Sequence, residues 1–163
     1  MRWLIALLLF GIPSGAFALS CLPPNAARSL DHAMQSGASV HAIAGTLQPL
    51  RADTVSPAGR TDKDIIYRLQ GTQLSRGGWL TDIDVELKIE TRCISNWCGK
   101  LPVGSTDGLF FLTSDQTGAL VLRVGPCGGT IFPPPDDAQR DALQRCAKAG
   151  RCKAEDLRLF ELR

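Results

Sequence analysis

The stretch Ile83-Asp84-Val85-Glu86-Leu87-Lys88-Ile89-Glu90 alternates apolar and charged side chains without interruption. Because successive side chains of a β-strand point to opposite faces, this period of two predicts a strand with one buried and one solvated face. We interpret the charged face as a solvated surface and not as acid/base machinery, since basic residues alternate with its carboxylates. The charged residues of this segment are Asp82, Asp84, Glu86, Lys88, Glu90 and Arg92.

Four further strands are predicted around this one. The first is a β-tolerant stretch at Ser39–Leu47 that ends before Pro49, and the second has Ile65, Tyr67 and Leu69 on one face. The last two, Phe110–Leu112 and Leu120–Val124, are joined by a Gly-containing connection of hairpin length. A polar loop is expected between the first two, at Arg51–Lys63. Five short strands separated by turn signals predict a small antiparallel barrel, although periodicity alone also permits a sandwich.

Helices are predicted on both sides of the strands. Asn25 caps a helix over Ala26–Gln35, whose apolar residues recur at intervals of three and four. Beyond three prolines, Asp136 and Asp137 place negative charge at the start of a helix that runs to about Lys148, and a short helix follows at Ala154–Leu159. With 163 residues and 44% apolar content, one domain is expected, covering 19–163 with a helical extension from about residue 136.

Residues 1–18 have the features of a signal peptide: a basic start, an apolar run over Leu4–Ile12, and Ala16-Phe17-Ala18 before the expected cleavage site. The apolar run is too short for a membrane-spanning helix, which needs about 20 such residues. We therefore expect a mature chain that begins at Leu19, is exported to the periplasm or the extracellular medium, and has no transmembrane segment. Lipid attachment at Cys21 is a minor alternative.

Six cysteines follow the cleavage site, and an even count in an oxidising compartment predicts three disulfides. Fifteen pairings are formally allowed. Because short loops close readily, Cys93–Cys98 and Cys146–Cys152 are the first choices, which leaves Cys21–Cys127 as a long-range link. The cysteine spacings match no common zinc motif and both histidines lie far upstream, so we expect neither a metal nor a cofactor.

Several function classes find little support in the sequence. The net charge of +2, without a cluster of basic residues, disfavours nucleic-acid binding. His41 lies within a predicted strand without a neighbouring nucleophile, so we interpret it as a structural histidine. The glycine-rich run Gly125–Gly129 lacks the lysine of a phosphate loop and is interpreted as a turn. We expect a protein that is not an enzyme.

Three stretches resemble a known family. Leu19-Ser20-Cys21-Leu22-Pro23-Pro24 is similar to a Cys-x-Cys-x-Pro-Pro opening, with Leu19 in place of the first cysteine. Tyr67–Gly77 ends, like a strand of the family, in a basic residue and glycine. Trp97-Cys98-Gly99 is followed by a Phe-Phe-Leu strand, a turn and a strand that leads to Cys127. In this order and spacing, the stretches resemble the inhibitory domain of the tissue inhibitors of metalloproteinases and the related netrin-like modules.

The resemblance implies a five-stranded barrel of the oligonucleotide/oligosaccharide-binding (OB) type, with Cys21 paired to Cys127. The family's other staple is missing because Leu19 replaces its cysteine, and Cys93 then supplies the partner that Cys98 needs. The inhibitors chelate a protease zinc ion through the amine and carbonyl of their first residue. The resemblance would place Leu19 and Ser20 there, without the staple that holds this terminus rigid.

Trp97, Leu101 and Pro102 flank the Cys-Gly turn and suggest an interaction surface. Packing of Trp97 over the Cys93–Cys98 pair explains the same residues equally well. We expect an exported, non-enzymatic protein with a netrin-like barrel that binds another protein or a small extracellular ligand. The alternatives are a metalloproteinase inhibitor that acts through its N-terminal segment and, third, a secreted enzyme.

Overall fold

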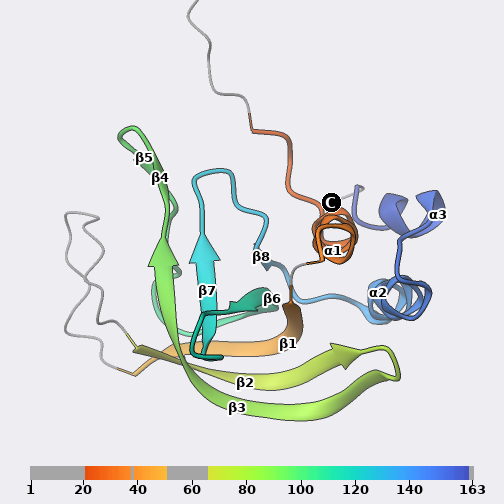
Figure 1. Ribbon diagram of the computed structural model, residues 1–163, viewed down its shortest axis with the longest axis horizontal. Helices are drawn as coiled ribbons and strands as arrows, with labels where there is room; N and C mark the ends of the chain where they lie inside the picture. The colour runs from red at the N-terminus through yellow and green to blue at the C-terminus, as the bar shows by residue number, and fades with distance from the viewer. Residues whose placement is uncertain (1–20, 38, 51–65, 162–163) are drawn as a thin grey trace, which may run out of the picture.

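A computed structural model describes residues 21–37, 39–50 and 66–161, which form a closed five-stranded barrel with three helices packed beside it (Figure 1). The expected signal peptide, Leu19, Ser20 and the expected loop at 51–63 lie outside these residues. The barrel strands are β1 (Val40–Pro49), β2 (Ile66–Ser75), β3 (Gly78–Thr91), β6 (Thr106–Ser114) and β7 (Leu120–Val124).

The strand order around the barrel is β1-β2-β3-β7-β6, and β6 closes it by pairing with β1. The predicted fold class, a disulfide-stapled barrel with flanking helices, is confirmed. One seam differs from the antiparallel expectation, because β3 and β7 run parallel. The chain leaves β3, returns through β6 on the far side of the barrel, and so enters β7 in the direction of β3. Periodicity reports faces and not directions, which is why the sequence did not reveal this pairing.

Three short strands lie outside the barrel. β4 (Cys93–Ile94) and β5 (Trp97–Cys98) form a separate two-stranded hairpin, and β8 (Ile131–Phe132) pairs with β6. The first barrel strand also extends further than predicted, to Pro49, which lies opposite Tyr67 at the end of the β1–β2 ladder. Proline is tolerated at this end of a strand because no further ladder hydrogen bond is needed from it.

A close approach of backbones allows the barrel to close. Gly45 on β1 faces Gly71 on β2 and Gly108 on β6. A Cβ added to Gly71 would lie 2.2 Å from the carbonyl oxygen of Ala44, so no other residue fits there without opening the seam. Glycine in a strand typically marks such a tight bend of a sheet.

Two apolar cores result from the alternation of side chains along the strands. One fills the barrel and the other lies between the barrel and the helices. Both include fully buried aliphatic and aromatic side chains, and each such side chain contributes roughly 1.5–3 kcal/mol by leaving water. The barrel core contains Ile43, Leu47, Tyr67, Leu69, Leu87, Ile89, Phe110, Leu112, Leu122 and Val124, and the second includes Ala27, Leu30, Leu109, Phe111, Phe132 and Leu143.

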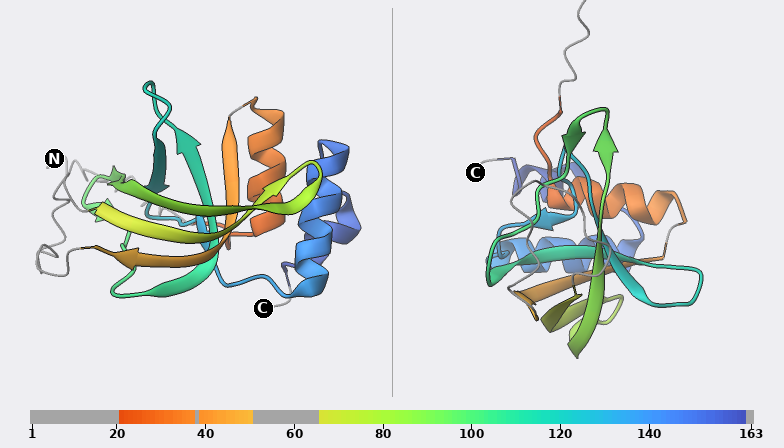
Figure 2. Two further views of the ribbon diagram at one scale, coloured as in Figure 1. Left: turned by 90° about the horizontal axis from the view of Figure 1, so that it is seen from below. Right: turned by 90° about the vertical axis from the view of Figure 1, so that its left-hand side faces the viewer.

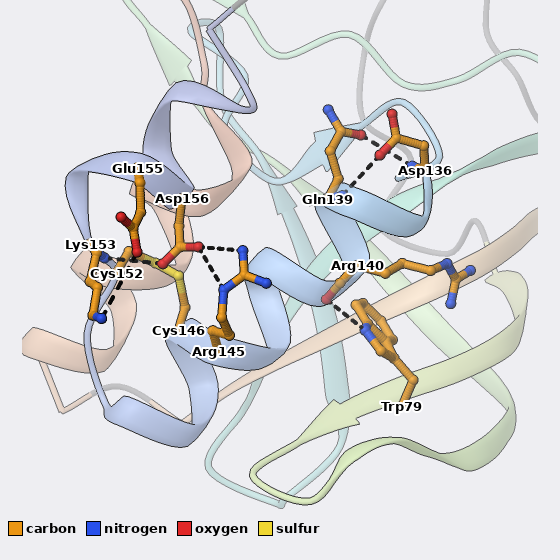
Figure 3. Close-up of polar contacts among 10 residues, drawn as sticks. All are labelled: Trp79, Asp136, Gln139, Arg140, Arg145, Cys146, Cys152, Lys153, Glu155 and Asp156. Atoms are coloured by element: carbon orange, nitrogen blue, oxygen red, sulfur yellow. Dashed lines mark hydrogen bonds and ion pairs between the residues drawn. A yellow bond between two sulfur atoms is a disulfide. The ribbon is translucent and has the colours of Figure 1, made fainter.

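The helices α1 (Ala26–Gln35), α2 (Asp137–Ala149) and α3 (Ala154–Arg158) cover one side of the barrel (Figure 2). The first and second begin as predicted, with the side chains of Asn25 and Asp136 accepting backbone N–H groups at their N-termini. Trp79 fastens β3 to α2, because its indole Nε1–H donates to the carbonyl of Arg140 at 3.2 Å (Figure 3).

The three predicted disulfides, Cys21–Cys127, Cys93–Cys98 and Cys146–Cys152, are all present. Three disulfides within one chain indicate an oxidising, exported environment. Because the sulfur of Cys21 is bonded to Cys127, it offers no thiol for a lipid. Among the described helices, none has the length and apolar character needed to cross a membrane.

Candidate binding site

The β4–β5 hairpin projects from one end of the barrel (Figure 1). Its strands pair Cys93 with Cys98 and Ile94 with Trp97, so the disulfide joins residues directly opposite each other. Because neighbouring residues of a strand point to opposite faces, Ile94 and Trp97 share the face opposite the disulfide. Trp97 is therefore directed away from the disulfide that it was alternatively expected to cover. Its side chain is exposed, at 44% of its full accessible surface.

The base of the hairpin is held against the end of β7. The backbone N–H of Arg92 donates to the carbonyl of Val124 at 2.8 Å, and the N–H of Gly99 donates to the carbonyl of Arg92 at 3.0 Å. A Cβ on Gly99 would lie 2.3 Å from the carbonyl oxygen of Val124. The glycine of the Cys98-Gly99 pair is thus required by a contact between two backbones, which fixes where the hairpin sits.

A groove of about 490 Å³ lies between this base and the loop that joins β7 to β8. Its size is that of sites that take small ligands or an anchoring side chain. The structure brings together in it three of the predicted binding residues, Trp97, Leu101 and Pro102. The rest of its lining comes from Cys98, Lys100, Val124, Gly125, Pro126, Gly128, Thr130 and Ile131.

The N-terminal segment lies on the other side of the same loop. Cys21 is bonded to Cys127, and a Cβ on Gly128 would lie 3.6 Å from the ring of Pro24. Figure 1 shows this segment and the hairpin projecting at one end of the molecule. Four exposed apolar residues come from these segments: Leu22 follows Cys21, Ile94 and Trp97 are paired on the hairpin, and Val103 follows the groove residue Pro102 in the chain. We call these four residues the apolar rim.

The groove has one charged lining residue, Lys100. Its ammonium group and the guanidinium of Arg92 make no ion pair within the described part of the chain. Between residues 91 and 106 the sequence contains these two basic side chains and no acidic one. The hairpin end of the barrel is therefore locally cationic in a chain of small net charge.

The charged face of β3 is solvated, as predicted, and two of its carboxylates, Asp84 and Glu90, pair with arginines of neighbouring strands. Arg68 on β2 donates both Nε and Nη2 to Asp84 at 2.6 Å, and Gln70 donates to the same carboxylate at 3.0 Å. The hydrogen bonds from Arg68, followed by that from Gln70, lower the pKa of Asp84 to about 2. A carboxylate that hydrogen bonds hold in its ionised form is a poor general acid or base near neutral pH.

A second polar cluster, which the sequence did not reveal, joins β1, β2 and the end of β6. Gln73 Nε2 donates to His41 Nδ1 at 3.1 Å, and His41 Nε2 lies 3.4 Å from the hydroxyl of Ser114. Both ring nitrogens thus have partners, as expected for a structural histidine.

Comparison of the chain with protein-family models, with curated proteins and with solved structures finds no match. In the described ranges no group of three or more His, Cys, Asp or Glu side chains is placed to hold a metal ion. The proposed function therefore rests on the geometry of the hairpin end of the barrel.

Sequence reasoning missed four residues of this end, Leu22, Ile94, Lys100 and Val103. A signal for Ile94 was present, because Ser95-Asn96 between Cys93 and Cys98 leaves room for a two-residue turn, and such a turn places Ile94 opposite Trp97. Ser95 adopts a positive φ of 54° there. Val124 and Ile131 also line the groove, but they do so through tertiary contacts that the periodicity of the sequence does not reveal.

Proposed function

We propose that the chain is an exported binding protein of netrin-like type, acting in the periplasm or the extracellular medium, and that it binds a protein partner through the groove and the apolar rim. One observation carries the proposal: Trp97 and Ile94 stand exposed on a hairpin that a disulfide and backbone hydrogen bonds hold in place. Tryptophan is enriched among residues that dominate binding energy.

The rigidity of the hairpin supports this assignment. Side chains that are ordered before binding lose less conformational entropy when a partner covers them, so more of the burial energy contributes to affinity. Exposed apolar residues scattered singly need no explanation, but Ile94 and Trp97 are paired on one hairpin and Trp97 also lines the groove, which is typical of an interaction site.

The experiment compares capture of partners by the mature protein, by Trp97→Ala and by Leu80→Ala. Leu80 is a matched control because it is also strongly exposed, at 73%, but lies at the start of β3, away from the groove. A protein of the exported fraction that the wild type and Leu80→Ala retain and Trp97→Ala loses supports the proposal. Its purified form should bind Trp97→Ala about 2 kcal/mol more weakly. Equal retention by all three proteins would remove Trp97 from the binding site.

A second candidate is inhibition of a metalloproteinase through the N-terminal segment. Its support is the Cys21–Cys127 bond, which ties the residues that follow Leu19 and Ser20 to the loop beside the groove. An α-amine with a pKa near 7.7–8.0 ligates zinc as the free base. The unstapled residues must however be ordered on binding, at roughly 1–2 kcal/mol each, so we expect no tight inhibition.

This alternative is tested by titrating a panel of metalloproteinases with the native N-terminus and with one additional N-terminal alanine. Nanomolar inhibition that the added residue abolishes would favour the inhibitor over the binding protein.

A further inference from the structure

We infer that the partner presents an acidic peptide segment, with a bulky apolar side chain for the groove and a carboxylate for Lys100. This inference rests on the proposed function and specifies the chemistry of the partner. Its basis is the combination of a groove whose described lining has Lys100 as its one charged residue, the lack of an ion pair for Lys100 within the described residues, and the exposed apolar rim on the segments next to the groove.

Lys100 has no acidic residue near it in the chain. The side chain lines the groove and is exposed, and its chain neighbourhood from 91 to 106 contains no acid. Arg92 contacts Gly99, the residue before Lys100, through the backbone hydrogen bond at the base of the hairpin. The acidic residue nearest along β3, Glu90, is already paired with Arg123 at 2.8 Å. Arg92 and Lys100 thus stand in the chain at the two ends of the hairpin, and a partner carboxylate in the groove would complement Lys100.

The exposed side chains of the apolar rim favour a peptide over a small carboxylate as the ligand. A fatty acid or similar ligand would fit the groove, but Leu22, Ile94 and Val103 do not line it. These side chains would remain in water around a small ligand, with Val103 exposed at 86%. A protein segment that continues past the groove covers them as well. Such a partner would bury the aromatic and aliphatic residues of the contact and place its carboxylate beside Lys100 in the groove.

The test uses a random peptide display library selected on the mature protein. Peptides that wild type retains and Trp97→Ala loses are the probes, and they establish that the groove binds. They are then measured against Lys100→Met, which keeps a long side chain without the charge, against Lys100→Arg, which restores it, and against Lys88→Met. Lys88 is the matched control because it is an exposed lysine on the solvated face of β3.

We expect the selected peptides to be enriched in Asp or Glu beside Leu, Phe or Trp. Lys100→Met should weaken them about two- to fivefold, as expected for an exposed ion pair, with most of the change in the association rate. Lys100→Arg should recover the affinity and Lys88→Met should leave it unchanged. The difference between wild type and Lys100→Met should shrink as salt is raised, because exposed charges are screened.

Peptides that depend on Trp97 but lack acidic residues, or that are indifferent to Lys100, would overturn the inference and leave the proposed function standing. The absence of any Trp97-dependent peptide would refute the proposed function, and the inference with it. Laurate is titrated in parallel. If laurate binds in a Trp97-dependent manner where no peptide does, the site takes a small carboxylate, and the peptide partner is excluded.

Discussion

The contact between Gly99 and β7 offers the sharpest test of how the hairpin is positioned. Replacing Gly99 with alanine adds a Cβ that would lie 2.3 Å from the carbonyl oxygen of Val124 and 2.6 Å from its carbonyl carbon. Both neighbours are backbone atoms, so no side-chain rotation relieves the overlap. The base of the hairpin must move away from the end of the strand.

The cost follows from what that movement breaks. The hydrogen bonds from Arg92 to Val124 and from Gly99 to Arg92 contribute about 0.5–1.5 kcal/mol each. Overpacking of a tight contact adds about 1–3 kcal/mol, part of which is the loss of these bonds. We expect Gly99→Ala to lower the free energy of unfolding by about 2–4 kcal/mol. A domain with an ordinary stability of roughly 5–15 kcal/mol still folds after this loss.

Gly125→Ala is the control. Gly125 lines the same groove, its φ is not in the left-handed region, and a Cβ there meets nothing within 4 Å. Denaturant unfolding of the two variants should give a lower midpoint for Gly99→Ala alone, with an unchanged slope, and a change within about 0.5 kcal/mol for Gly125→Ala. Equal stability of the two variants would show that Gly99 is not seated on Val124, and the groove would lose its structural basis.

Three further predictions concern stability. Replacing Cys21 and Cys127 together with serine should cost about 2–5 kcal/mol, more than removing either local disulfide, because their separation of 106 residues closes the longest loop; denaturant unfolding measures this. Thr91→Val should raise thermal stability by about 1 kcal/mol, since the Thr91 hydroxyl is buried without a partner in the described structure; a loss instead would reveal a hidden partner. The lowered pKa of Asp84 makes its ion pair stabilising above the ordinary aspartate value of 3.8, and that contribution is lost as the pH falls toward 2. An NMR titration of Asp84 should therefore show a midpoint near 2, and a midpoint near 3.8 would contradict the pairing with Arg68.

The elements that could be predicted from the sequence are those with a strong local cause. The helix Ala26–Gln35 has a capping asparagine and an apolar stripe, and its bounds agree with the prediction. The disulfides Cys93–Cys98 and Cys146–Cys152 follow from short loop closure, which then leaves Cys127 for Cys21. The residues that determine the helix and the two local disulfides lie close together in the chain. Cys21 and Cys127 are the two cysteines left once those local disulfides are assigned.

The features that could not be predicted depend on distant parts of the chain. Gly99 stands out in the sequence only as part of the Trp97-Cys98-Gly99 motif, and the reason that glycine is needed there is visible only once Val124 is placed against it. The parallel pairing of β3 with β7 and the meeting of His41 with Ser114 likewise require the closed barrel. Trp97, Leu101 and Pro102 were selected because of the Cys-Gly turn, yet the groove between them exists only because β7 and β8 supply its other wall.

The way the hairpin is built bears on how it would recognise a partner. The disulfide between Cys93 and Cys98 closes the hairpin. The free-energy cost of the positive φ at Ser95 arises when the chain folds and is not added on binding. The backbone contacts of Gly99 fix its base. A flexible loop of the same sequence would lose roughly 1–2 kcal/mol of backbone entropy per residue on binding, enough to cancel the gain from burying one tryptophan. Because folding has already ordered these residues, burial of Trp97 would contribute to the affinity for the proposed partner, and discrimination between partners would come from the shape of the groove and from the charge of Lys100.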